Sequence, residues 1–150
     1  MRAGEMCMRD VAIAAADDDV MTAAKRMREL HVGSLVVVDE EDGDRYPVGI
    51  VTDRDLLVAV LTEELGHARE LSVRDVMTTD ILTAREDEDV YDALQRMRGR
   101  GVRRLPVVDD QGRLAGILTF DDLVEWVTEE LEQLTKLVRR EQERERATRP

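Results

Sequence analysis

Cysteine is almost absent from this chain, because Cys7 is the only one among 150 residues. A lone cysteine cannot form a disulfide within the chain, which fits a reducing compartment such as the cytoplasm. The chain also lacks a long uncharged apolar run, and its first residues, MRAGEMCMRD, lack the apolar segment of a secretory signal. We therefore expect a cytoplasmic globular protein with no membrane partner.

Aromatic residues and net positive charge are lacking as well. Aromatics make up 3% of the residues and the formal net charge is -12. Such a surface repels nucleic acid phosphates over most of its area and offers no platform on which bases could stack. A nucleic acid partner is not expected, whereas a small anionic ligand stays compatible, because local arginines and helix N-termini can reverse the potential inside one cleft.

Residue spacings that would indicate catalysis are missing too. His31, His67 and Cys7 do not fall into the spacing of a triad or a metal site. The acidic runs ADDDV and EDEDV fit helix capping better than a cation site, which needs convergent ligands at fixed spacing. We expect no catalytic residue, no metal and no required cofactor, so an enzyme is the weaker class of function.

An internal repeat is the strongest positive feature. Residues 10–39 align with residues 80–109 at a shift of about seventy residues, and GIVTDRDL at 49–56 recurs as GILTFDDL at 116–123. Each copy predicts a short strand, a helix capped by Asp19 or Asp89, two further strands and a second helix. One β-α-β-β-α copy is too small to close a core comfortably, so we expect an α+β fold in which the two copies pack together.

The repeated motif admits two interpretations. Thr52 with Asp55, and Thr119 with Asp122, have the spacing of a helix-capping box. The same groups also suit a nucleotide, because a helix N-terminus attracts phosphate and a carboxylate accepts the hydroxyls of ribose. The glycine would permit close approach of backbone to such a ligand. Both interpretations stay open at this level.

Together, the repeat and the motif resemble a tandem pair of cystathionine-β-synthase-type (CBS) domains. The stretch GVRRLPVVDDQGRLAGILTFDDL is very similar to the family pattern, and the first copy is more degenerate. The resemblance implies two β-α-β-β-α units packed through their sheets about a pseudo-twofold axis. It also implies two clefts that bind AMP, ADP, ATP or S-adenosylmethionine, and frequent homodimers.

The resemblance implies ligand-binding residues by matching position. In the second copy they are Thr119, Asp122, Ile81, Leu82, Thr83, Val102, Arg103 and Arg104. In the first copy they are Thr52, Asp55, Val11, Ile13, Val32 and Ser34, and Arg54 is a further candidate for phosphate. Gly33 and Ser34 replace the arginine pair and Val36 replaces Pro106. We therefore expect the second-copy cleft to be the better nucleotide site. Replacement of Asp122 by alanine should then weaken nucleotide binding.

The predicted boundaries are residues 4–66 for the first CBS unit, 67–127 for the second, and 128–150 for a charged helical tail. The tail carries a narrow apolar seam, expected to dock on the protein's own second unit or on a dimer mate, with a heterologous partner as the alternative. Beyond Val138 the chain is expected to fray. The predicted function is regulatory sensing of an adenosine ligand on behalf of an unidentified regulated protein. The alternative is a structural or interaction module with vestigial clefts.

Overall fold

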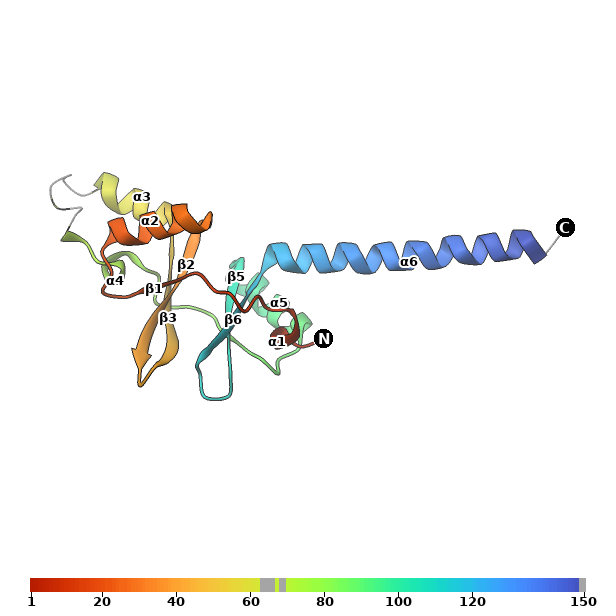
Figure 1. Ribbon diagram of the computed structural model, residues 1–150, viewed down its shortest axis with the longest axis horizontal. Coiled ribbons are helices and arrows are strands. Elements are labelled where there is room, and N and C mark those ends of the chain that lie inside the picture. Colours follow the sequence, from red (N-terminus) through yellow and green to blue (C-terminus); the bar gives the residue numbers. More distant parts are fainter. Residues whose placement is uncertain (63–66, 68–69, 149–150) are drawn as a thin grey trace. The chain divides into compact units, whose positions relative to one another are not determined.

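The computed structural model describes residues 1–62, 67 and 70–148 of the chain (Figure 1). The chain divides into two compact units. The first, Met1–Leu118, contains the first copy of the repeat and the second copy up to its last strand. The second begins at Thr119 and contains the long C-terminal helix. The boundary predicted after residue 66 lies outside the described residues.

Both copies fold in the predicted order of strand, helix, strand, strand and helix. The elements of the first copy are β1 (Ile13–Ala15), α2 (Val20–Leu30), β2 (Ser34–Glu41), β3 (Asp44–Thr52) and α3 (Asp53–Thr62). Those of the second are β4 (Ala84–Arg85), α5 (Val90–Arg100), β5 (Arg104–Val108), β6 (Leu114–Thr119) and α6 (Phe120–Thr148). The strands form two three-stranded sheets, ordered β1-β2-β3 and β4-β5-β6. The α+β prediction is confirmed.

The first helix of each copy begins and ends as its sequence dictates. The carboxylate of Asp19 accepts a hydrogen bond from the Thr22 amide at 2.7 Å, and that of Asp89 accepts one from the Tyr91 amide at 2.8 Å. Both predicted N-caps are therefore confirmed. At the other end, His31 and Gly101 adopt the left-handed conformation, with φ of 54° and 67°, which turns the chain into the next strand.

The acidic runs also hold a repeated ion pair. Asp18 contacts Arg26 at 3.0 Å, and at the matching place Glu88 contacts Arg96 at 2.6 Å. Each arginine also donates to a carbonyl of the preceding strand segment, that of Ile13 in one copy and that of Thr83 in the other. The runs thus fasten strand to helix.

Two short helices show that the copies exchange the segments before their first strands, residues 1–12 and 70–83, here called lead-ins. The lead-in of the first copy, α1 (Ala3–Met6), donates from Ala3 to the carbonyl of Glu88 at 2.8 Å. The lead-in of the second copy, α4 (Val73–Val76), donates from Val73 to the carbonyl of Asp18 at 2.8 Å, and Val73 is buried in the first copy's core. Each packed unit in the structure therefore combines the strands and helices of one copy with the lead-in of the other copy.

The motif glycines lie where these lead-ins cross the sheets. A Cβ on Gly49 would lie 2.7 Å from Met77 Sδ and 2.9 Å from the carbonyl oxygen of Thr78. In the second copy, a Cβ on Gly116 would collide with Cys7 Sγ. The close approach predicted for these glycines is thus made to the chain's own lead-ins. Cys7 is buried there, and burial raises the pKa of its thiol.

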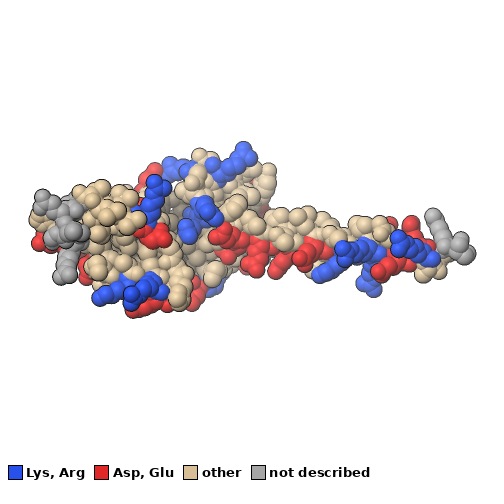
Figure 2. All heavy atoms as spheres, turned by 90° about the horizontal axis from the view of Figure 1, so that it is seen from above, with Lys and Arg blue, Asp and Glu red and all other residues tan. Residues whose placement is uncertain are grey.

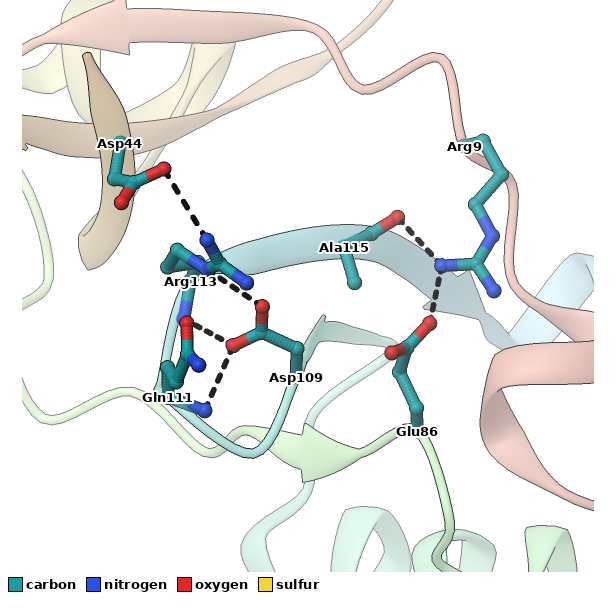
Figure 3. A network of polar contacts seen from close by, with 7 residues as sticks. All are labelled: Arg9, Asp44, Glu86, Asp109, Gln111, Arg113 and Ala115. Atoms are coloured by element: carbon teal, nitrogen blue, oxygen red, sulfur yellow. Dashed lines mark hydrogen bonds and ion pairs between the residues drawn. The ribbon is translucent and has the colours of Figure 1, made fainter.

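Polar contacts also join the two copies at their hairpins (Figure 3). Arg113, next to the start of β6, reaches across to Asp44 of β3 at 3.5 Å and holds Asp109 at 2.7 Å. Arg9, in the first lead-in, donates to the carbonyl of Ala115 at 3.0 Å. Burial alone would raise the pKa of Asp109, but hydrogen bonds from the amide and guanidinium of Arg113 outweigh it and hold that pKa below its usual value.

The C-terminal helix, α6, is one continuous element of 29 residues. It therefore runs through the boundary predicted at residue 128, and the fraying expected beyond Val138 is not observed, because the helix continues to Thr148. Within the described residues, no helix is both long and apolar enough to cross a membrane.

Candidate functional site

A cavity of about 180 Å³ in the first unit brings together six of the predicted ligand residues. Those residues are Thr52, Ile81, Leu82, Val102, Arg103 and Arg104, and Ile50, Thr78 and Asp80 complete the lining. The wall is mostly aliphatic, with hydroxyl and guanidinium groups at a few points. Ligand sites commonly combine an apolar wall with a small number of polar groups in this way.

This cavity is assembled from both copies of the repeat. Thr52 and Ile50 come from β3 of the first copy, whereas Ile81 and Arg103 come from the second. Ile50 and Thr78 exchange backbone hydrogen bonds of 3.0 and 2.9 Å, so the exchanged lead-in forms part of the wall. The prediction grouped Arg103 with the threonine of its own copy; the structure groups it with Thr52, because the lead-in that carries this side of the cavity lies along β3.

Two arginines give one side of the cavity a positive charge. Arg103 is exposed and Arg104, at the start of β5, is half-buried. Asp80 is the acidic residue of the lining, and it forms an ion pair of 2.7 Å with Arg100. The lining thus offers two guanidinium groups, and guanidinium groups suit an anionic ligand group.

Pro106 changes the backbone beside the cavity. In the first copy the amide of Val36 donates to the carbonyl of Ala12 at 2.9 Å. Pro106 occupies the matching position in the second copy and has no N–H to offer the matching carbonyl, that of Leu82. Strand pairing begins at Ala84 in the second copy, one position later than the match of Ile13 in the first.

The first copy has a corresponding hollow of different chemistry. This hollow, of about 440 Å³, is lined by the predicted residues Val11, Ile13 and Val32, and also by Asp10 and Arg26. Its arginine is already paired with Asp18. The two linings differ in their arginines, which are Arg103 and Arg104 in one cavity and Arg26 in this hollow.

Three other predicted residues of the first copy lie elsewhere. Arg54 and Asp55 line a separate hollow between α3 and α4. Ser34 pairs with Thr52 across β2 and β3. In the second copy, the carbonyl of Thr83 is held by Arg96 at 2.9 Å. These residues have structural contacts that the sequence pattern does not distinguish from ligand contacts.

The threonine and aspartate of each motif form a capping box. The Thr52 amide donates to Asp55 Oδ2 at 2.9 Å and the Asp55 amide donates to Thr52 Oγ1 at 3.2 Å. Thr119 and Asp122, in the second unit, make the same pair of bonds at 3.0 and 3.2 Å. A carboxylate has about four acceptor positions, so capping by one oxygen leaves capacity for a ligand.

Three lining residues were missed by sequence reasoning, namely Ile50, Thr78 and Asp80. Ile50 is the aliphatic next to the motif glycine, and Thr78 and Asp80 belong to the lead-in TTDI, which matches MRDV in the alignment of the two copies. That alignment was the available signal. Among the described residues, no group of three or more His, Cys, Asp or Glu side chains is placed to hold a metal ion.

Comparison with known proteins finds the same family twice along the chain. The family model described as CBS domain matches residues 3–62 and 73–129. An uncharacterized protein of Methanopyrus kandleri, MK0525, is 38% identical over 122 residues, which are 81% of this chain and 60% of that protein. An inosine-5'-monophosphate dehydrogenase of Methanocaldococcus jannaschii is 37% identical over 123 residues, 82% of this chain and 23% of the enzyme. The chain thus spans less than two thirds of either relative.

Solved structures of similar fold include complexes with adenosine compounds. The CBS domain pair of protein MJ0100, in complex with 5'-methylthioadenosine and S-adenosyl-L-methionine, has a TM-score of 0.73 at 26% identity and covers 87% of this chain and 98% of that one. CBSX2 in complex with AMP has a TM-score of 0.72 at 29% identity and covers 85% of this chain and 96% of that one. The ligands of these two similar structures thus include adenosine compounds without phosphate and one with phosphate.

Proposed function

This chain belongs to the CBS domain family, as a tandem pair, and on that premise we propose that it is a regulatory module that binds an adenosine ligand carrying phosphate. The observation that carries the proposal is the cavity lined by Thr52, Ile81, Leu82, Arg103 and Arg104. Similar CBS pairs are known in complex with AMP and with S-adenosyl-L-methionine. The arginine pair favours the former class of ligand, because a guanidinium attracts phosphate and repels a sulfonium.

The size and backbone of the cavity fit the base of such a ligand. At about 180 Å³ it is smaller than the roughly 300–1,000 Å³ of ordinary small-molecule pockets. We therefore propose that it encloses the base between aliphatic side chains, while ribose and phosphate extend toward Thr52 and the arginines. The carbonyl of Leu82, which Pro106 cannot bond, is available to accept from an amino group on the base.

The remaining predicted residues differ in their relation to the proposal. Arg54 and Asp55 line a different hollow and have no part in the proposal for this cavity. Asp122 stays a predicted acceptor of ribose hydroxyls, with its capping bond retained. The proposed role is regulatory rather than enzymatic, because the dehydrogenase relative shares 23% of its own length with this chain. We place the module in the cytoplasm, where the lone Cys7 stays reduced.

Calorimetric titration of AMP, ATP and S-adenosylmethionine into the full chain tests the proposal. Replacement of Arg103 or Arg104 by glutamine should weaken AMP or ATP by about tenfold to a hundredfold, the usual range for a lost charge-assisted hydrogen bond. The same changes should not weaken S-adenosylmethionine. Arg98→Gln is the matched control, because Arg98 lies in the last turn of α5 and is absent from the cavity lining.

A second variant separates the base from the phosphate. Pro106→Val restores an N–H that can bond the Leu82 carbonyl, as Val36 bonds Ala12 in the first copy. It should weaken every adenosine compound by a similar factor. If none of the compounds binds wild-type protein, the sensing proposal fails and the alternative of an interaction module with vestigial clefts is favoured.

A further inference from the structure

The long helix α6 exposes a continuous apolar seam. Its members are Val124, Val127, Leu131, Leu134 and Val138, which recur at alternating spacings of three and four residues. Their exposed fractions lie between 45% and 59%, and Leu137 beside them is 65% exposed. This spacing places the side chains in one line along the helix, in the pattern that pairs with a second helix. A seam this open calls for a partner.

Charge is divided between the two halves of the same helix (Figure 2). The first half, up to Leu134, has six acidic residues and no basic one, namely Asp121, Asp122, Glu125, Glu129, Glu130 and Glu132. The second half, from Thr135, has five basic residues, namely Lys136, Arg139, Arg140, Arg144 and Arg146, and three acidic ones, namely Glu141, Glu143 and Glu145. A partner helix that matches both halves must be basic where α6 is acidic.

We propose that the seam is covered by α6 of a second copy of this chain, running antiparallel. In a parallel pair the acidic half of each helix would lie alongside the acidic half of the other, which is unfavourable. Reversal of one helix sets each acidic half against a basic half. Antiparallel helix dipoles also attract, whereas parallel ones repel. The same chain therefore supplies both the apolar surface and the complementary charge.

The seam fixes the register of this pair. Its spacing from Val127 to Val138 reads the same in both directions, about a centre between Leu131 and Leu134. Antiparallel pairing about that centre sets Val127 of one copy opposite Val138 of the other. In this register the acidic half of each helix lies alongside the more basic half of the other. A helix of 29 residues is about 43 Å long, and the centre of the pair lies close to its middle.

Sedimentation velocity of the full chain over a range of concentrations tests the surface. Leu131→Lys should raise the dimer dissociation constant on the order of a hundredfold, because each dimer loses two buried leucines. Gln133→Lys adds the same charge on a face away from the seam and should leave dimerisation nearly unchanged. A wild-type chain that stays monomeric, or a dimer indifferent to Leu131→Lys, overturns the proposal and leaves another occupant for the seam.

Cysteine cross-linking tests the orientation. In a Cys7→Ala background, Val127→Cys and Val138→Cys are made as separate proteins and oxidised alone or mixed. The antiparallel pair predicts a disulfide-linked dimer only in the mixture, with one chain of each variant. Self-linked dimers of either variant alone would indicate a parallel pair, and no cross-link in any sample would indicate that the seams do not meet; both results overturn the proposal. Circular dichroism verifies that each variant keeps its helix content.

Discussion

Replacement of Gly49 by alanine should destabilise the protein, because the added methyl group has no room. Its Cβ would lie 2.7 Å from Met77 Sδ and 2.9 Å from the carbonyl oxygen of Thr78. The Met77 side chain can rotate away. The Thr78 carbonyl cannot, because the carbonyl and the amide of Thr78 are both hydrogen-bonded to the backbone of Ile50. Relief of the clash therefore requires the lead-in to move off strand β3.

The size of the effect follows from three contributions. Overpacking at a tight contact costs about 1–3 kcal/mol. Weakening of the two hydrogen bonds between Ile50 and Thr78 adds about 1 kcal/mol for each bond that is lost. Alanine offsets about 0.4–1 kcal/mol by restricting the unfolded chain. The net expectation is a decrease of about 2–3 kcal/mol in the free energy of unfolding.

Urea denaturation followed by circular dichroism measures this decrease, and Gly99→Ala is the matched control. Gly99 lies in α5, and a Cβ added there would have no atom within 4 Å, so alanine should raise the free energy of unfolding by about 0.5 kcal/mol through helix propensity. The two substitutions are chemically identical and should have opposite signs. Equal stability of Gly49→Ala and wild type would refute the assignment of this glycine to the crossing of the lead-in.

Two further predictions concern the acidic runs. Asp19→Ala should lower the urea midpoint at neutral pH, because hydrogen bonds from the Thr22 amide and hydroxyl hold the pKa of Asp19 below its usual value. This contribution is fully present above the ordinary pKa of about 3.9 and is lost as pH falls through the lower folded value, so the two midpoints should converge below about pH 4. Arg96→Met should cost about 1 kcal/mol, because it removes a two-oxygen ion pair with Glu88 and a bond to the Thr83 carbonyl. Thermal unfolding should show that Arg96→Lys recovers only part of that loss.

Local elements could be predicted from the sequence because their signals are local. Asp19 and Asp89 stand directly before an apolar helical pattern, and capping needs only the residues that follow. The apolar runs SLVVVD and RLPVVD likewise became the central strands β2 and β5. The exchange of α1 and α4 could not be predicted in this way, because a repeat reports which segments are alike and not which copy each segment packs against.

The sequence predicted several residues of the site, but it did not predict which copy supplies each part of the cavity wall. Arg103, Arg104, Ile81 and Leu82 do gather in one cavity, as position in the family pattern implies. Within the first unit, the motif threonine that lines the cavity with them is Thr52 of the other copy. This pairing follows from the crossing of Thr78 along β3, which is a tertiary contact with no signal in either copy alone.

The crossing also links ligand binding to the packing of the two copies. Thr78 contributes to the cavity wall and, through its backbone, to the contact with Ile50. A ligand that fills this cavity therefore touches both copies at the place where one lead-in joins the other sheet, and it stabilises that join by mass action. Since Gly49→Ala displaces the same segment, the variant should bind the ligand more weakly and gain less thermal stability from a saturating dose than wild type does. Such a difference would mean that Gly49, which is not part of the cavity lining, affects the site indirectly. It leaves the space in which Met77 and Thr78 lie against β3, and Thr78 lines the cavity.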